Sequence, residues 1–371
     1  VVAQSRCTGR DAAPLACCRM TRATSNGTEP MKDKPDGVVL PSRVIPFPTS
    51  ISDEARTALQ RLVGSDGVPL NALHVMPSPD DFDAWMRVKA AADAHYAAAI
   101  EQLGGSLRSS VETIRAGAAD VHVATPEAAA SSECAYIDLH GGALVLGGGA
   151  ACRAGAQMQA DRLGIRCYGV DYRLPPEHPY PAALDDCIST YAYVLEHYAP
   201  ENIVIGGRSA GGNLAAAMVL RARDEGLPLP AALVLLSPEV DLTESGDSFE
   251  TNRLVDVMLP ASLMPNNLLY ANGADLAHPY LSPLFGDFSA GFPPTFIQSG
   301  TRDLFLSNAV RLHRALRRAQ VPTELHVFEG MPHGGFMGAP EDRELSQEIA
   351  RFVHAHLPAS DVESKPSSAD R

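Results

Sequence analysis

Short apolar runs separated by helix-length segments fill most of the chain after its first third. Between most of these runs, apolar residues recur at the three- and four-residue spacing of a helix, as in segments 151–163, 181–198 and 304–318. The predicted strands are 135–139, 166–170, 202–205, 232–236, 295–298 and 324–328. Because parallel strands need long crossover connections, this alternation predicts an α/β fold with a mostly parallel sheet flanked by helices on both faces.

The segments before this alternation predict an antiparallel sheet edge and two helices. Residues 111–115 and 121–123 alternate in polarity like the strands of a half-buried hairpin. Ser52 is expected to cap a helix over 53–63, because a serine oxygen can accept a hydrogen bond from a free N–H group of the first turn. A longer helix is expected over about 81–103.

One connection is too long for a simple crossover. About fifty residues separate Asp241 from Pro293, and structureless connections of that length are uncommon unless they carry function. The apolar residues in this connection predict short helices that shield a site. They are Leu254, Val255, Met258, Leu263, Met264, Leu268 and Leu269.

Charge and composition exclude several classes of protein. The formal net charge is -14, whereas a nucleic-acid binder needs a basic face and an anionic membrane surface repels an acidic protein. No apolar run reaches the roughly 18 residues of a membrane span, and the N-terminus lacks a signal peptide's apolar stretch. A cytoplasmic location is therefore expected. The 7 cysteines form no Cys-x-x-Cys pair, so buried free thiols are expected instead of a zinc or redox site.

The stretch 203–213 indicates chemistry most strongly. Gly207, Ser209 and Gly211 form the pattern Gly-x-Ser-x-Gly between an apolar strand and the helical pattern of 214–220. This strand–turn–helix context presents a serine as a nucleophile, and the glycines keep neighbouring side chains from colliding at the turn. Taken alone, the pattern also fits a phosphate-binding turn, although no Gly-x-x-x-x-Gly-Lys accompanies it.

The loop after the first predicted parallel strand reads His140-Gly141-Gly142-Ala143. Backbone N–H groups of Gly141 and Gly142, together with that of Ala210, are predicted to bind the oxyanion that forms during acyl transfer. His140 is expected to brace this loop and not to act as a base. A plain glycine turn is the alternative, which the serine motif makes less favourable.

A serine nucleophile needs a base, usually a histidine held by a carboxylate. His333 stands in a loop of glycine and proline after the last predicted strand, as befits an exposed functional loop. Asp303 follows the strand expected to lie beside that last strand, and Asp241 is the rival acid. The order Ser209, Asp303, His333 matches the chain order of a serine–acid–histidine triad.

With these motifs in place, the chain from about Pro46 to Leu357 resembles the bacterial hormone-sensitive-lipase-like (family IV) esterases of the α/β-hydrolase superfamily. The resemblance rests on four groups of residues. They are His140-Gly141-Gly142-Ala143, the segment 171–179 (DYRLPPEHP), the segment 207–213 (GRSAGGN), and Asp303 with His333.

The resemblance implies an α/β-hydrolase fold with an eight-stranded, mostly parallel sheet and a helical cap. It divides the chain into a catalytic domain (107–241 and 293–358) and two cap segments (49–106 and 242–292). An irregular arm (1–48) and a polar tail (359–371) flank them. The sequence departs from the family at three positions. Ala143 replaces a glycine, Arg208 replaces an acidic or small residue, and Ser307 replaces an aspartate.

The function that follows is hydrolysis of short- to medium-chain carboxylic esters through an acyl-enzyme, with no metal or organic cofactor. Ser209, Asp303 and His333 would be catalytic, supported by His140, Gly207 and Gly211. Alternatives are a lactone hydrolase with the same triad and a catalytically dead ligand-binding relative. A homodimer through the C-terminal helix and the edge strand is implied by the resemblance alone.

Two further expectations concern the surroundings of the serine. Arg208 and Glu239 follow neighbouring strands, so an ion pair between them is a hypothesis for bracing the turn. Trp85 and Met86, with the apolar residues of segment 242–292, are expected to line an apolar substrate pocket.

Overall fold

The computed structural model describes residues 37–103, 106–127, 131–259 and 262–358. Most of the predicted arm (1–48) and the whole predicted tail (359–371) lie outside these residues. The chain divides into two compact units, Val1–Val44 and Ile45–Arg371. Residues 37–44 of the first unit contain neither helix nor strand, so the remaining description concerns the second unit.

The second unit contains one sheet of eight strands in the order β1-β2-β4-β3-β5-β6-β7-β8. The edge strand β1 pairs with β2, and β2 pairs with β4, both in antiparallel fashion, and the other pairings are parallel. The strands are β1 (Ser110–Ala116), β2 (Ala119–Thr125), β3 (Ser131–Leu139), β4 (Ile165–Asp171), β5 (Ile203–Arg208), β6 (Ala232–Leu236), β7 (Thr295–Gly300) and β8 (Thr323–Phe328). Each strand predicted from the sequence is present, including the antiparallel edge hairpin.

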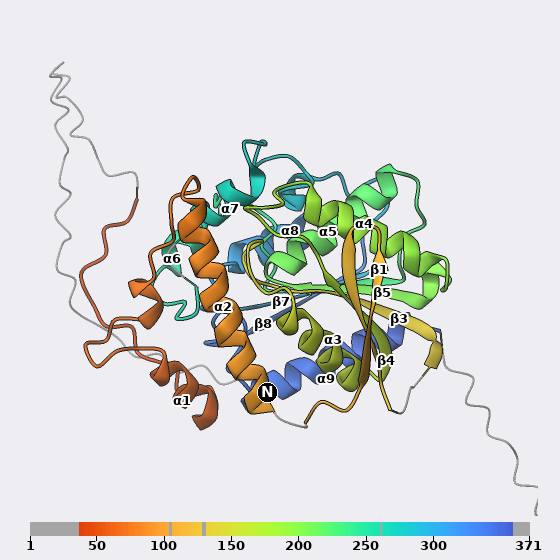
Figure 1. Ribbon diagram of the computed structural model, residues 1–371. Coiled ribbons are helices and arrows are strands. Elements are labelled where there is room, and N and C mark those ends of the chain that lie inside the picture. The colour runs from red at the N-terminus through yellow and green to blue at the C-terminus, as the bar shows by residue number, and fades with distance from the viewer. Residues whose placement is uncertain (1–36, 104–105, 128–130, 260–261, 359–371) are drawn as a thin grey trace, which may run out of the picture. The chain divides into compact units, whose positions relative to one another are not determined.

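Helices cover both faces of the sheet (Figure 1). The longer helices are α1 (Asp53–Arg61), α2 (Phe82–Leu103), α3 (Ala150–Leu163), α4 (Ala182–Leu195), α5 (Ala210–Asp224), α7 (Met264–Ala271), α8 (Leu306–Arg318) and α9 (Pro340–His356). The short ones are η1 (Leu70–Leu73), η3 (Pro200–Asn202), α6 (Ser248–Thr251) and η4 (Pro283–Phe285). Helices α3 and α9 lie below the sheet in Figure 1, and α4, α5 and α8 lie on its other face.

The alternation of side chains along the strands produces two separate cores. In β5, Ile203 and Ile205 pack with the α4, α5 and α8 side, whereas Val204 packs with α3 and α9. Both faces of the central strands are therefore apolar, which explains why these strands appear in the sequence as continuous apolar runs.

The predicted N-terminal helices are present, and a cap at the first one connects it to the end of the chain. Ser52 Oγ accepts a hydrogen bond of 3.1 Å from the N–H of Ala55, as the sequence predicts. The same hydroxyl and the N–H of Ser52 donate to the Glu341 carboxylate at 2.8 and 2.7 Å. This contact fastens α1 to the start of α9.

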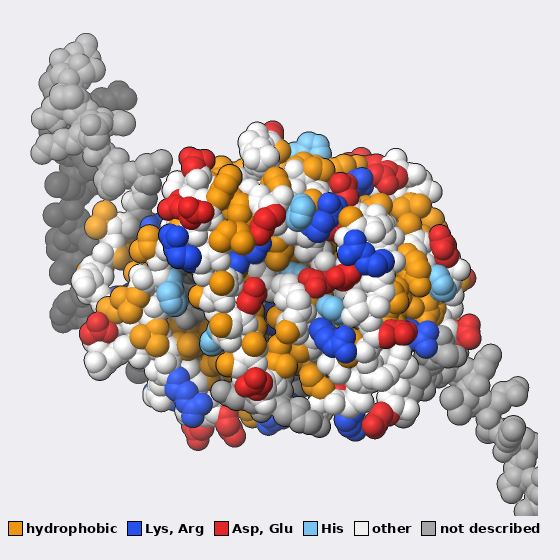
Figure 2. Space-filling model, viewed as in Figure 1, with side chains coloured by type: hydrophobic (Ala, Val, Ile, Leu, Met, Phe, Trp, Pro, Cys, Tyr) orange, Lys and Arg blue, Asp and Glu red, His pale blue; other side chains and the backbone are white. Residues whose placement is uncertain are grey.

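Several expectations of the sequence concern cysteines and membranes. Cys134, Cys152, Cys167 and Cys187 are buried free thiols, as predicted, whereas Cys7, Cys17 and Cys18 lie outside the described residues. Among the helices that the structure describes, none combines the length and apolar character of a membrane span. On the face shown in Figure 2, acidic and basic side chains are interspersed.

Candidate active site

Ser209 lies in the sharp turn between β5 and α5. Its backbone has φ 58° and ψ -121°, a left-handed conformation that side chains rarely adopt and that costs about 1–3 kcal/mol. Hydrogen bonds hold the residue there, because its N–H donates to Leu236 O at 2.9 Å and its C=O accepts from the N–H of Glu239 at 3.2 Å. The serine is thus fixed by its backbone at the N-terminus of α5, where the helix dipole favours negative charge.

The glycines around Ser209 are required by close backbone contacts. A Cβ on Gly207 would lie 2.2 Å from Gly211 O, and one on Gly211 would lie 1.9 Å from Leu139 O. Both distances are far below van der Waals contact. The turn can therefore pack against the end of β3 only with glycine at these two positions.

The loop after β3 contacts this turn and is internally braced. A Cβ on Gly141 would lie 3.1 Å from Arg208 O, so the loop backbone touches the turn. His140 Nδ1 donates to Gly141 O at 2.8 Å, and its ring stacks on Tyr172 at 3.9 Å between ring centroids. The Tyr172 hydroxyl donates to His140 O at 2.7 Å. Within the described parts of the chain, no hydrogen bond engages the N–H of Gly141 or Gly142.

Ala143 stands at the position where the sequence resemblance implies a glycine. Its φ is 51°, so the alanine adopts the left-handed backbone conformation that suits glycine better.

Asp303 and His333 lie together on the loops after β7 and β8. The Nδ1 of His333 and the Oδ1 of Asp303 are 3.2 Å apart, and both side chains are buried. Asp303 also accepts hydrogen bonds from the Ser299 hydroxyl at 2.8 Å and from the Phe305 N–H at 2.9 Å. Burial alone would raise the pKa of Asp303, but the charge and hydrogen bond of His333, followed by the Phe305 N–H, bring the pKa below its ordinary value.

The rival acid, Asp241, is engaged elsewhere. Its Oδ2 forms an ion pair with Arg311 at 2.5 Å and accepts a hydrogen bond from the Ser245 hydroxyl at 2.7 Å. Because Asp241 binds these partners and Asp303 binds His333, the structure brings together the pair that the sequence favoured.

Within the described residues, no hydrogen bond links the Ser209 hydroxyl to His333. The two side chains nevertheless line the same cavity of about 560 Å³. Catalytic hydrogen bonds are often long in unliganded structures and tighten when substrate binds, so the arrangement is compatible with proton transfer.

The cavity is lined mainly by apolar side chains. Several come from α2 and from segment 242–292, and the loop residues Gly141 and Gly142 lie at its wall. Its larger apolar residues are Met76, Tyr96, Ile100, Leu146, Met158, Met258, Leu259 and Leu263. The prediction of an apolar pocket is therefore correct in character.

The prediction that Trp85 and Met86 line the pocket is wrong. Trp85 is fully buried against Val145 and Leu269, and its indole N–H donates to Ser78 O at 3.0 Å. Met86 is exposed and lies outside the cavity lining. The helical period placed both residues on α2 correctly, but it could not tell which face of α2 turns to the cavity.

The hypothesis of an Arg208–Glu239 ion pair is also wrong. Among the described residues, no ion pair includes Arg208, whose guanidinium donates instead to Gly334 O at 2.9 Å. Glu239 is fully buried, and within the described residues neither an ion pair nor a backbone N–H engages its carboxyl oxygens. Arg208 thus braces the loop that carries His333, a role that its position next to the serine did not indicate.

Sequence reasoning missed two buried polar residues near the site. Asp256 accepts hydrogen bonds from the backbone N–H groups of Leu304 at 2.7 Å and of Met258 at 2.9 Å. Leu304 directly follows Asp303 in the chain. Asn266, on α7, lines the cavity. Both lie in segment 242–292, where the sequence offers no periodic signal for such contacts.

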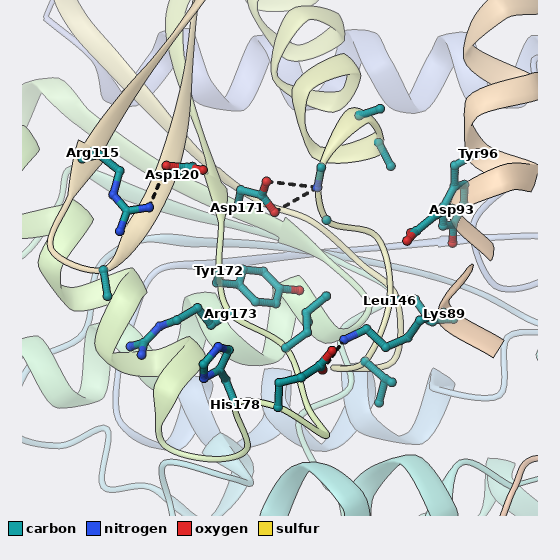
Figure 3. A pocket seen from close by; sticks show the side chains of 18 residues that line it. Lys89, Asp93, Tyr96, Arg115, Asp120, Leu146, Asp171, Tyr172, Arg173 and His178 are labelled. Carbon is teal, nitrogen blue, oxygen red and sulfur yellow. Dashed lines mark hydrogen bonds and ion pairs between the residues drawn. The ribbon is translucent and has the colours of Figure 1, made fainter. Parts of the chain in front are cut away.

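A second, polar pocket adjoins the cavity and shares Tyr96 and Leu146 with it (Figure 3). Two ion pairs lie at its wall. Lys89 on α2 lies 2.6 Å from Glu177, and Arg115 lies 2.9 Å from Asp120. The Lys89–Glu177 pair joins α2 to the loop after β4.

One group of described side chains has the composition of a metal site. Ligand atoms of His140, Cys152 and Asp171 lie within 4.8 Å of one another. However, both carboxylate oxygens of Asp171 accept the N–H of Gly149 at 3.0 Å, and burial raises the pKa of the Cys152 thiol. The carboxylate of Asp171 is thus already engaged by the backbone at the start of α3.

Comparisons with known proteins agree with this geometry. A family described as having the alpha/beta hydrolase fold matches residues 136–337. An esterase of Acinetobacter venetianus is 33% identical over 233 residues, which cover 61% of this chain and 77% of that protein.

Two solved structures extend the likeness. The crystal structure of an esterase has a TM-score of 0.79 at 33% identity and covers 86% of this chain and 99% of its own. The structure of an esterase from the bacterial hormone-sensitive lipase family has a TM-score of 0.70 at 28% identity. The match covers 82% of this chain and 99% of that esterase. The chain therefore belongs to the α/β-hydrolase family and, within it, to the bacterial hormone-sensitive-lipase-like esterases.

Proposed function

We propose that the protein hydrolyses carboxylic esters of short to medium acyl chain through an acyl-enzyme on Ser209. The observation that carries the proposal is the strained turn at Ser209, which opens into the same apolar cavity as the His333 of the Asp303–His333 pair. A serine held in that conformation next to a buried acid–base pair is the arrangement that acyl transfer requires.

The reaction follows from the positions of the polar groups. Asp303 binds Nδ1 of His333, so Nε2 is the nitrogen free to take the proton of the Ser209 hydroxyl as the oxygen attacks the ester carbonyl. The N–H groups of Gly141, Gly142 and Ala210 stabilise the resulting oxyanion. His333 then protonates the leaving alcohol, and water with His333 as base cleaves the acyl-enzyme.

The surroundings support the proposed substrate range. A cavity of about 560 Å³ is in the usual range for small-molecule sites, and its apolar wall suits an aliphatic acyl chain. We assign the walls from α2 and from segment 242–292 to a helical cap, formed by 49–106 and 242–292. The Lys89–Glu177 pair then helps to hold this cap on the catalytic domain.

The test is a series of p-nitrophenyl esters from acetate to laurate, assayed with the wild type and with Ser209→Ala. We expect activity highest on the shorter esters and a loss of about 10⁴-fold or more in the variant. If the wild type hydrolyses none of these esters, the carboxylesterase proposal fails. Lactones are then the substrates to assay with the same two proteins.

A further inference from the structure

One cation interrupts the mainly apolar cavity that Ser209 and His333 line. Arg208 lines this cavity with them, and among the described residues no lysine, no other arginine and no acidic residue belongs to its lining. The chain as a whole has a formal net charge of -14. The charge that the protein places in the wall next to its serine is therefore opposite in sign to that of the whole molecule.

The guanidinium of Arg208 is only partly engaged by the protein. Its Nη1 donates to Gly334 O at 2.9 Å in a solvent-exposed hydrogen bond, and Gly334 also lines the cavity. Within the described parts of the chain, no ion pair and no further hydrogen bond of this side chain is found. None of its nitrogens is both buried and unpartnered, so those without a protein partner remain accessible. A ligand in the cavity can reach them.

Neighbouring charges compensate this cation only in part. Burial, followed by the charge of Arg162, lowers the pKa of Arg208 below its ordinary value, and the charges of Asp342, Asp138 and Asp303 oppose this shift without reversing it. Asp303 is bound to His333 at 3.2 Å and is thus already engaged. An additional negative charge beside the guanidinium is therefore stabilised.

Holding the His333 loop does not explain why the residue is charged. Any side chain with an N–H group can donate to Gly334 O, so the hydrogen bond alone requires no cation. A guanidinium at an apolar cavity also loses hydration when a neutral substrate fills the space, which is costly. A substrate with an anionic group offsets this cost, because a carboxylate can accept hydrogen bonds from the free N–H groups.

We propose that Arg208 forms an anion-binding subsite of the catalytic cavity and that the protein hydrolyses esters that carry a carboxylate. The guanidinium donates to the carboxylate while the ester carbonyl lies at Ser209. The inference rests on the ester hydrolysis proposed above and narrows its substrate class to acidic esters. The carboxylate can belong to the acyl part or to the alcohol part, and the test separates these two sources.

The experiment compares matched esters in which an uncharged amide replaces the carboxylate. For the acyl part the pair is monoethyl adipate and ethyl adipamate, and for the alcohol part it is 4-butanoyloxybutanoate and 4-butanoyloxybutanamide. The ratio of kcat/KM, acid over amide, is measured for each pair at neutral pH and physiological ionic strength. A general loss of activity lowers both members of a pair alike, so the ratio isolates the effect of the charge.

Three variants test Arg208 itself. Arg208→Gln removes the charge and keeps an N–H for Gly334 O, Arg208→Met removes both, and Arg208→Lys keeps the charge. Arg162→Gln is the matched control. Arg162, on α3, acts on the charge of Arg208 but does not line the cavity.

We expect the wild type to favour the acid of one pair about tenfold, the order of one hydrogen bond to a charged group. The ratio should fall to one or below in Arg208→Gln and Arg208→Met and stay above one in Arg208→Lys. In Arg162→Gln it should remain within about twofold of the wild type, since solvent and salt screen a charge that does not touch the substrate.

Wild-type ratios at or below one in both pairs would overturn the subsite, and this result needs no variant. A ratio that survives in Arg208→Gln and Arg208→Met would also overturn it, as would an equal fall in Arg162→Gln. Hydrolysis of the amide members tests the proposed function separately, because it does not depend on the carboxylate.

Discussion

Asp303 and Glu239 are both fully buried carboxyl groups, and each follows the end of one of two neighbouring strands, β7 and β6. Asp303 lies 3.2 Å from His333 and accepts two more hydrogen bonds. Glu239 has no ion pair and no backbone donor among the described residues, and burial, followed by the charge of Glu244, raises its pKa to about 8, a rise that the Asn267 side chain offsets only in part. At neutral pH one group is therefore a carboxylate and the other a neutral acid.

Asp256 is intermediate between Asp303 and Glu239 in its hydrogen-bond partners and in its pKa. Backbone N–H groups of Leu304, Met258 and Leu259 donate to it, but it forms no ion pair with another described residue. Burial, with the charge of Asp303, raises its pKa to about 6. The three carboxyl groups show that equal burial leads to different ionisation, because the number and charge of the partners decide whether the charged form is stabilised.

The largest expected difference is catalytic. Asp303→Asn should lower kcat about 10⁴-fold, because the amide cannot stabilise the imidazolium or hold the correct His333 tautomer. Glu239→Gln should leave kcat close to the wild type, since it replaces a neutral acid by a neutral amide of the same shape. Both are measured on p-nitrophenyl butanoate. A comparable loss in Glu239→Gln would show that the buried acid takes part in the reaction.

Glu239 should instead make stability depend on pH between about 4.3 and 8. Its folded-state pKa of about 8 lies above the unfolded value of about 4.3, so the folded state holds a proton that the unfolded state releases. The wild type should therefore lose stability relative to Glu239→Gln as pH rises from about 4.3 through 8, by a few kcal/mol in all.

Urea unfolding of the two proteins at pH 5, 7 and 9 measures this effect. Thr323→Ser, an exchange remote from the site, provides a control whose difference from the wild type should not vary with pH. If the two curves of wild type and Glu239→Gln stay parallel, Glu239 is ionised in the folded protein and the contrast with Asp303 disappears.

Asp256→Asn should have a smaller effect, which is on the free energy of unfolding. One part of the effect comes from a lost hydrogen bond and the other from the ionisation of the wild-type carboxyl. The asparagine keeps one acceptor oxygen, so at least one of the backbone N–H groups of Met258, Leu259 and Leu304 then faces its NH₂ group and loses its bond, at about 1–3 kcal/mol. The wild-type carboxyl is neutral below its folded-state pKa of about 6 and loses stability as pH rises through that value. The variant should therefore be most destabilised, relative to the wild type, at pH 5 and less so at pH 7.5. An equal deficit at both values, measured by thermal unfolding, would mean that Asp256 does not titrate in this interval.

The contrast between the carboxyl groups also marks how far the sequence could lead. Strands, crossover helices and the glycines around Ser209 follow from local period and spacing, and the loops of Asp303 and His333 follow from strand order. Whether a buried carboxyl has partners depends on side chains brought from distant elements. Asp256 reaches the loop of Asp303 from segment 242–292, and Arg208 reaches Gly334 across 126 positions of the chain. No local pattern encodes these contacts, which is why Asp256 and Asn266 were missed and Glu239 received the wrong partner.

The smallest expected effect is the coupling energy between Arg208 and Glu239, which should be close to zero. A buried ion pair, once broken from one side, costs about 3–5 kcal/mol, so a true pair would give a large coupling energy in a double-mutant cycle. Because Arg208 donates to Gly334 O and Glu239 is neutral, Arg208→Met and Glu239→Gln should act independently on the free energy of unfolding, within about 0.5 kcal/mol. Arg208→Met alone should lower kcat, since it releases the loop that carries His333, and Glu239→Gln in the same background should not lower it further. A coupling energy above about 1 kcal/mol would restore the ion pair and require Glu239 to be charged.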